Sequence, residues 1–119
     1  FLKWYDDVLD YYPLWVVPYR PPSRYPWINP QHGASSKSEY FIDCAIYGKR
    51  NDKPGVDYYK LLEDKTRELG GIKTLISKNS YAEKDFWSVY NQEAYNRVKQ
   101  RSDPHNMFRG LYEKFNPKA

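Results

Sequence analysis

Prolines crowd one stretch of this chain and limit what it can fold into. Six of the nine prolines lie between residues 13 and 30: Pro13, Pro18, Pro21, Pro22, Pro26 and Pro30. Proline lacks a backbone N–H and disfavours a helical residue before it, so no long helix or central strand can cross this stretch. Because Gly33 and four serines lie in the same region, we predict a long loop over residues 20–38.

Short elements are predicted on both sides of this loop. Apolar residues at helical spacing predict an amphipathic helix over residues 1–12, and an apolar run between prolines predicts a strand over residues 14–19. Alternating residues predict a second strand over residues 39–47. Cys44 lies on its apolar face and is interpreted as a small core residue rather than a nucleophile. A single cysteine also excludes an intramolecular disulfide.

Two further elements are predicted after the second strand. A helix over residues 56–69 ends at paired glycines, and a third strand follows over residues 72–77. On the helix, Glu63 and Arg67 have the spacing of an i,i+4 ion pair. The adjacent carboxylates of Glu63 and Asp64 are interpreted as solvent-exposed.

The C-terminal part of the chain is predicted to be helical. Ser80 and Glu83 have the S-x-x-E spacing of a capping box, which predicts a helix start. A helical stretch over residues 92–101 is followed by Asp103 and a proline, which predict a last helix with Met107 on its apolar stripe. The order of elements predicts an α+β fold with an antiparallel sheet, helices on one face, and closing helices after it.

Residue chemistry alone reveals no self-contained active site and no catalytic residue. The chain has neither a G-x-G-x-x-G nor a P-loop pattern, and therefore no phosphate cradle of its own. Neither His32 nor His105 has a second ligand at metal spacing, so no metal site is assigned. The net charge of +4 is spread over 19 basic and 15 acidic residues, unlike the clustered excess of most nucleic-acid binders. No apolar run is long enough for a transmembrane helix.

One basic segment stands out near the end of the 92–101 helix. Arg97 and Arg101 share one helix face. Tyr95 and Lys99 share the adjoining face, and Asn91 lies just upstream. Positive charges and a phenol near a helix end could hold an anion or a polarised ring. The alternative is a cationic helix end that complements the helix dipole, and the residue pattern leaves both open.

Several sequence blocks, in the same order, resemble one enzyme family. They are YPLWVVP (12–18), YFID (40–43), GGIK (70–73), FWSVY (86–90) and EAYNRVKQRSDP (93–104). Together they resemble the C-terminal end of FAD-linked oxidoreductases of the vanillyl-alcohol-oxidase type, nearest to sterol side-chain (delta-24) reductases and bacterial methylene-fatty-acid reductases. The resemblance runs from about Tyr12 to Tyr112, with the proline-rich loop as the divergent part.

The resemblance implies a division into two parts. Residues 1–79 would be the C-terminal portion of a substrate or cap domain, and residues 80–119 would be closing helices that return to an FAD-binding domain. That domain would precede these residues in the same parent protein. We therefore expect a fragment that is inactive alone, with FAD as the cofactor and most FAD contacts outside this chain.

The resemblance also assigns roles to particular residues. Cations of the basic segment would lie near the flavin's N1–C2 edge, where positive charge stabilises the anionic reduced ring. The cofactor-binding candidates implied in this way are Tyr95, Lys99, Arg101 and Asn91. The substrate-lining candidates, all from the two predicted strands, are Trp15, Tyr19, Phe41, Asp43 and Tyr47.

The expected function is hydride transfer between the flavin and a lipid-like substrate, either a sterol or an unsaturated fatty acyl chain. The expected partners are the FAD-binding domain and that substrate, with no nucleic acid, at a location that is cytoplasmic or peripheral to a membrane. Apolar surface left by an absent partner favours self-association. Two alternatives stay open: a free-standing module that stacks on single-stranded nucleic acid, and a structural interaction domain.

Overall fold

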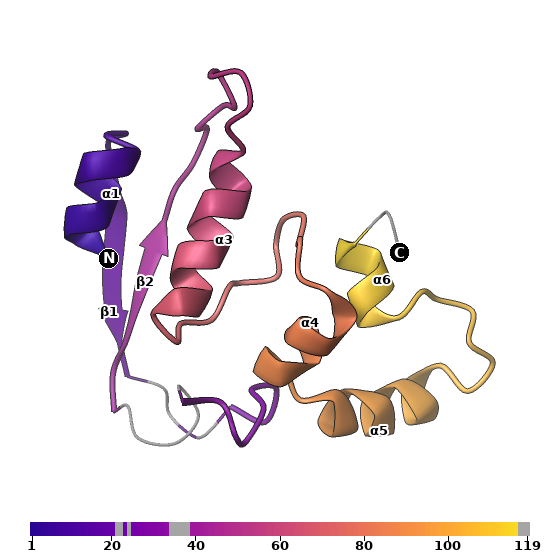
Figure 1. Cartoon of the computed structure of the whole chain (residues 1–119). Helices are drawn as coiled ribbons and strands as arrows, with labels where there is room; N and C mark the ends of the chain where they lie inside the picture. The colour runs from indigo at the N-terminus through magenta and orange to yellow at the C-terminus, as the bar shows by residue number, and fades with distance from the viewer. Residues whose placement is uncertain (21–22, 24, 34–38, 117–119) are drawn as a thin grey trace.

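Five helices and two strands make up the part of the chain that the structure describes. The computed structural model describes residues 1–20, 23, 25–33 and 39–116. The elements run α1 (Leu2–Val8), β1 (Trp15–Tyr19), β2 (Phe41–Ala45), α3 (Tyr58–Glu68), α4 (Glu83–Val89), α5 (Gln92–Ser102) and α6 (Leu111–Phe115). The predicted α+β fold is thereby confirmed. Figure 1 shows α1, the strands and α3 in one half of the molecule and α4 to α6 in the other.

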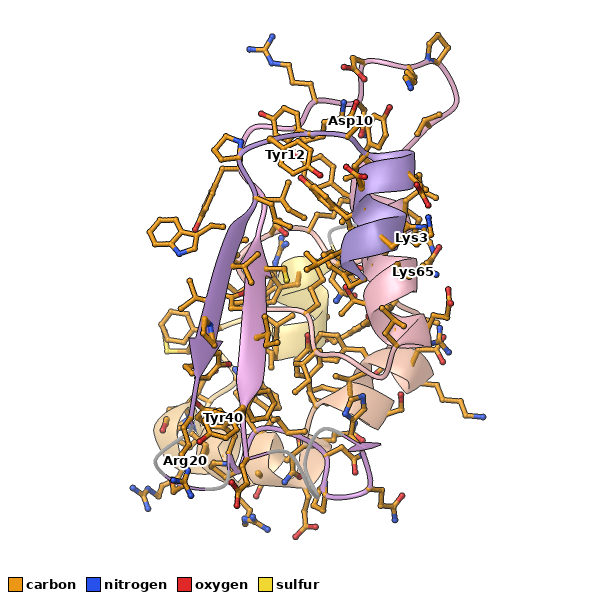
Figure 2. The ribbon with its side chains drawn as sticks, turned by 90° about the vertical axis from the view of Figure 1, so that its left-hand side faces the viewer. Lys3, Asp10, Tyr12, Arg20, Tyr40 and Lys65 are labelled. Atoms are coloured by element: carbon orange, nitrogen blue, oxygen red, sulfur yellow. The ribbon has the colours of Figure 1, made fainter. Side chains whose placement is uncertain are left out.

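The two strands form an antiparallel pair. Trp15 lies opposite Ala45, and Tyr19 lies opposite Phe41. Directly opposed residues share a face of the sheet, so Trp15, Tyr19 and Phe41 lie on one face. Figure 2 shows α1 and α3 together on one side of this sheet. The predicted proline-rich loop connects the strands, and of its residues 21–22, 24 and 34–38 lie outside those described.

Each half has its own small core of aromatic and aliphatic side chains. The first cluster is built from Tyr5, Leu9 and Tyr58, with Leu14 and Ile46 from beside the strands packed against it. The second cluster consists of Tyr81, Phe86, Val89 and Tyr90. The segment between α3 and α4 connects the two clusters (Figure 1).

The predicted third strand over residues 72–77 is wrong. After α3 the chain turns at Gly70, whose φ of +68° lies in the left-handed region that favours glycine. A Cβ on Gly71 would lie 3.0 Å from the Thr66 Cγ2 atom, so the chain passes close to α3 there. Within the described residues the segment pairs with no strand. Its apolar side chains pack against the second cluster instead, through Ile72 and Leu75.

The prediction that Glu63 is solvent-exposed is also wrong. Glu63 is 2% exposed and accepts a hydrogen bond of 2.7 Å from Lys73 Nζ. The Ser80 backbone N–H lies 3.0 Å from both of its carboxylate oxygens. Arg67, the predicted partner of Glu63, pairs with Asp85 at 2.7 Å. Glu63 therefore ties α3 to the segment that leads into α4, and we call these contacts the Glu63 link.

Two predicted helix starts are wrong. The capping box does not form, and α4 begins after Ala82 with no side-chain cap. Asp103 does not begin a helix, because its carboxylate accepts hydrogen bonds from the backbone N–H groups of Met107 and Phe108 within a turn. The last helix begins only at Leu111. Met107, predicted to lie on an apolar helix stripe, is 79% exposed.

Candidate functional site

A cavity of about 920 Å³ lies between the sheet and the C-terminal helices. Its walls come from the ends of β1 and β2, the loop over residues 25–28, the segment over residues 69–75, the junction of α4 and α5, and the start of α6. Eight aromatic side chains line it: Tyr19, Tyr25, Trp27, Tyr40, Phe41, Trp87, Tyr90 and Tyr95. We call this space the aromatic cavity. Its size is in the range of cavities that hold small organic ligands.

The strand β2 presents an edge to the aromatic cavity rather than one face. Four consecutive residues, 40–43, line the cavity, although successive side chains of a strand point to opposite faces. Among the described residues, β2 pairs with β1 alone, so its other edge has no strand partner. Unpaired N–H and C=O groups at such an edge are available to polar groups of a ligand.

Part of the proline-rich loop is held against the junction of α4 and α5. The Asn91 N–H donates to the Trp27 carbonyl oxygen at 2.8 Å, and the Asn29 N–H donates to the Val89 carbonyl oxygen at 2.8 Å. The Asn29 side chain also donates to the Trp87 carbonyl oxygen at 3.0 Å. These bonds join residues far apart in sequence and fix Trp27 in the cavity wall.

Few charged groups reach the aromatic cavity. Lys73 lines it, but its ammonium is paired with Glu63 and also donates to the Lys78 carbonyl oxygen. Asp43 has no cation within ion-pair distance among the residues that the structure describes. Burial, with smaller contributions from Tyr25 and Asp43, raises the pKa of Tyr19. Among the described residues, the cavity lining is therefore mainly aromatic, with one carboxylate, that of the exposed Asp43, that has no ion-pair partner.

The structure brings two of the four predicted cofactor-binding residues to the cavity. Asn91 and Tyr95 line it, and the Tyr95 hydroxyl accepts a hydrogen bond of 2.9 Å from the Leu111 N–H. Lys99 and Arg101 are not among the lining residues. The Lys99 ammonium donates hydrogen bonds to the Asp103 carboxylate and to the Phe108 carbonyl oxygen. Arg101 is exposed. A role of these four residues in holding flavin stays a prediction.

Three of the five predicted substrate-lining residues line the cavity. They are Tyr19, Phe41 and Asp43, and the Tyr19 and Phe41 rings stack with centroids 5.7 Å apart. Trp15 and Tyr47 lie elsewhere and are 62% and 66% exposed. Four further lining residues were not predicted from the sequence: Trp27, Lys73, Trp87 and Tyr90. The available signal was the aromatic content of residues 25–27 within a loop otherwise rich in proline.

No group of three or more His, Cys, Asp or Glu side chains in the part of the chain that the structure describes could hold a metal ion. None of the helices in that part of the chain has the length and apolar character needed to cross a bilayer.

Replacing Asn91 by alanine is expected to lower the free energy of unfolding by about 0.5–2 kcal/mol, the range found for losing a helix N-cap. The Asn91 carboxamide oxygen accepts from the Ala94 N–H at 3.1 Å at the start of α5, and its amide nitrogen donates to the Pro26 carbonyl oxygen at 2.9 Å. Urea unfolding followed by tryptophan fluorescence measures the loss. The exposed Asn96 on the same helix provides the control, and equal losses for Asn91→Ala and Asn96→Ala would contradict the assigned roles.

Comparison with known proteins gives one distant similarity. The chain is similar to a Delta(24)-sterol reductase of Rattus norvegicus, with 21% identity over 119 aligned residues. The alignment covers 95% of this chain and 22% of that protein, so the chain spans less than a quarter of the relative's length. No family model and no solved structure matches the chain. The similarity extends over nearly the whole chain, as does the resemblance of the separate sequence blocks.

Proposed function

We propose that this chain forms the substrate-binding wall of an FAD-dependent oxidoreductase that acts on a sterol-like lipid. Two observations support the proposal. The relative is named as a reductase that acts on a sterol, and it aligns with nearly the whole chain. The aromatic cavity, which carries the proposal, combines eight aromatic side chains with the carboxylate of Asp43, which has no ion-pair partner among the residues that the structure describes.

The chemistry of the aromatic cavity suits a neutral lipid. A sterol is a rigid apolar ring system with one hydroxyl group, so aromatic walls match most of its surface. The carboxylate of Asp43 can accept a hydrogen bond from the hydroxyl group of a sterol, whereas the hydrocarbon tail of an unsaturated fatty acyl chain has no donor for it. Of the two substrate classes that the resemblance implies, we therefore propose the sterol.

The described residues fit the substrate better than they fit the FAD phosphates. The lysine that lines the cavity is already paired with Glu63, and the sequence contains no glycine-rich phosphate cradle. We propose that the contacts to FAD come mainly from another domain of the parent protein. When bound there, FAD supplies the hydride chemistry. On this proposal the chain's own residues bind the lipid and exclude water from it.

The division at residue 79 and the binding partners also remain proposals. The aromatic cavity takes lining residues from both sides of that boundary, since Phe41 precedes it and Tyr95 follows it. We propose that the parent enzyme needs both parts to close the substrate site. Self-association of the isolated chain, and a cytoplasmic or membrane-peripheral location, belong to the same proposal.

Replacing Phe41 by serine is expected to weaken binding of a sterol with a Δ24 double bond by about tenfold or more, because a large aromatic contact is lost. Quenching of Trp27 and Trp87, which line the cavity, reports the binding. Circular dichroism verifies that each variant is folded. Trp15→Ser is the matched control, because Trp15 shares the face of Phe41 but lies outside the cavity.

Two results would contradict the proposed function. In the first, Phe41→Ser and Trp15→Ser lower the affinity for the sterol equally. The sterol would then bind outside the aromatic cavity. The other is failure to bind the sterol together with steep salt-dependent retention on single-stranded polynucleotide, which would favour the nucleic-acid module.

A further inference from the structure

Two adjacent apolar side chains project into solvent between α5 and α6. Met107 is 79% exposed and Phe108 is 74% exposed. Figure 1 shows the segment between these helices reaching outward, away from the rest of the molecule. Single exposed apolar residues are common on protein surfaces, but here two consecutive residues of one loop are both largely exposed. We call Met107 and Phe108 the apolar tip.

The backbone of the apolar tip is held by a polar network beneath it. The Asp103 carboxylate accepts from the Met107 N–H at 2.8 Å and from the Phe108 N–H at 3.0 Å. Lys99 pairs with this carboxylate and donates to the Phe108 carbonyl oxygen at 2.6 Å. Asn106, with a φ of +52°, donates its N–H to the Asp103 carbonyl oxygen at 3.1 Å. The tip is therefore presented in one conformation, so little ordering is needed when it binds.

Positive charge gathers around the apolar tip. Residues 97–114 contain five Lys or Arg and two Asp or Glu, a formal net charge of +3, although Arg97 is paired with Glu93 just upstream. The two acidic groups are already engaged, Asp103 as described and Glu113 by the Gly110 N–H. Arg101 lies in the last turn of α5, and Arg109 follows the tip directly. Neither has an ion-pair partner in the described part of the chain.

We propose that the apolar tip inserts into the surface of an anionic lipid bilayer. The apolar interior of the interface covers Met107 and Phe108, while Arg101 and Arg109 contact the acidic headgroups. For Arg101, which does not line the aromatic cavity, this role replaces the predicted contact with flavin. A bilayer accepts a convex apolar tip without a complementary groove, which favours it over a protein partner. The association is weak and reversible, because two side chains and a few charges supply it. In this position the chain would remain at the membrane surface.

Sedimentation of the full chain with vesicles tests this proposal. Vesicles of phosphatidylcholine with 30% phosphatidylserine are expected to bind the chain, and binding should fall as salt rises. The double substitution Met107→Ser/Phe108→Ser should lower the partition coefficient by about tenfold or more. The double substitution Arg101→Gln/Arg109→Gln should lower it by about fivefold for each arginine. The matched control is Ile76→Ser, since Ile76 is 78% exposed at a different place on the surface.

The vesicle result does not depend on the proposed sterol site. Neither residue of the apolar tip lines the aromatic cavity, so sterol quenching serves as a separate measurement on the same variants. Equal vesicle binding by the wild type and the tip variant would overturn the proposal. So would a tip substitution that changes the oligomeric state without lipid, because a second copy of the chain would then cover the tip. Binding that is independent of phosphatidylserine would contradict the role of the two arginines.

Discussion

Replacing Glu63 by alanine is expected to destabilise the protein by about 3–5 kcal/mol, the range measured when one partner of a buried ion pair is removed. The Glu63 side chain is 1% exposed, and that of Lys73 is 16% exposed. Without the carboxylate, the Lys73 ammonium and the Ser80 N–H lose their partner in a poorly solvated place. Urea unfolding at neutral pH, followed by circular dichroism, measures the change in the free energy of unfolding.

The next residue in the chain supplies the control for Glu63. Asp64 forms an exposed pair with Lys60, with side chains 51% and 45% exposed. Asp64→Ala is therefore expected to cost less than about 1 kcal/mol. Glu63→Gln keeps hydrogen-bond acceptance from Ser80 but removes the charge, so its effect should be intermediate. Similar losses from Glu63→Ala and Asp64→Ala would show that the Glu63 link contributes little to stability.

Replacing Phe86 by alanine is expected to cost about 3–5 kcal/mol, as for other fully buried aromatic residues. Phe86 is 0% exposed, and its ring lies 4.6 Å from Tyr90, 4.8 Å from Trp87 and 5.4 Å from Tyr112, measured between centroids. The variant removes the centre of the second cluster. Phe108→Ala is the matched control and should change stability by less than about 0.5 kcal/mol, because that side chain is exposed.

Amide hydrogen exchange locates the effect of Phe86→Ala. The first cluster contains neither Phe86 nor the rings that contact it. Protection of backbone amides from exchange should therefore decrease less around Tyr5 and Tyr58 than in α4 and α6. An equal loss of protection in both halves would mean that the two clusters unfold as a single unit.

Local sequence signals located most of the elements. Pro13 and the prolines that follow it limit regular structure in this stretch to the short strand β1. The paired glycines after residue 69 predict the end of α3 to within one or two residues. The same signals gave the wrong result for residues 72–77. A short apolar run fits a strand and a packed irregular segment equally well, and the difference depends on whether a strand edge lies beside it.

The buried carboxylate and the aromatic cavity depend on contacts between distant residues. Glu63 is buried because Lys73 and Ser80 reach it from another segment, and helical spacing alone contains no sign of this. Trp27 lines the cavity because Asn29 and Asn91 fasten its loop to residues more than fifty positions away. By contrast, the resemblance implied Tyr19 and Phe41 as substrate-lining candidates, and both line the cavity, although strand alternation alone did not select their face.

The arrangement of two small cores around a shared space has a consequence for heat denaturation. Each core can melt at its own temperature, since neither contains the residues of the other. A ligand in the aromatic cavity would contact Phe41 from one half of the molecule and Tyr95 from the other. Melting of either half would therefore remove part of the binding site. Occupancy would thus add to the Glu63 link and favour the melting of both cores in a single cooperative transition.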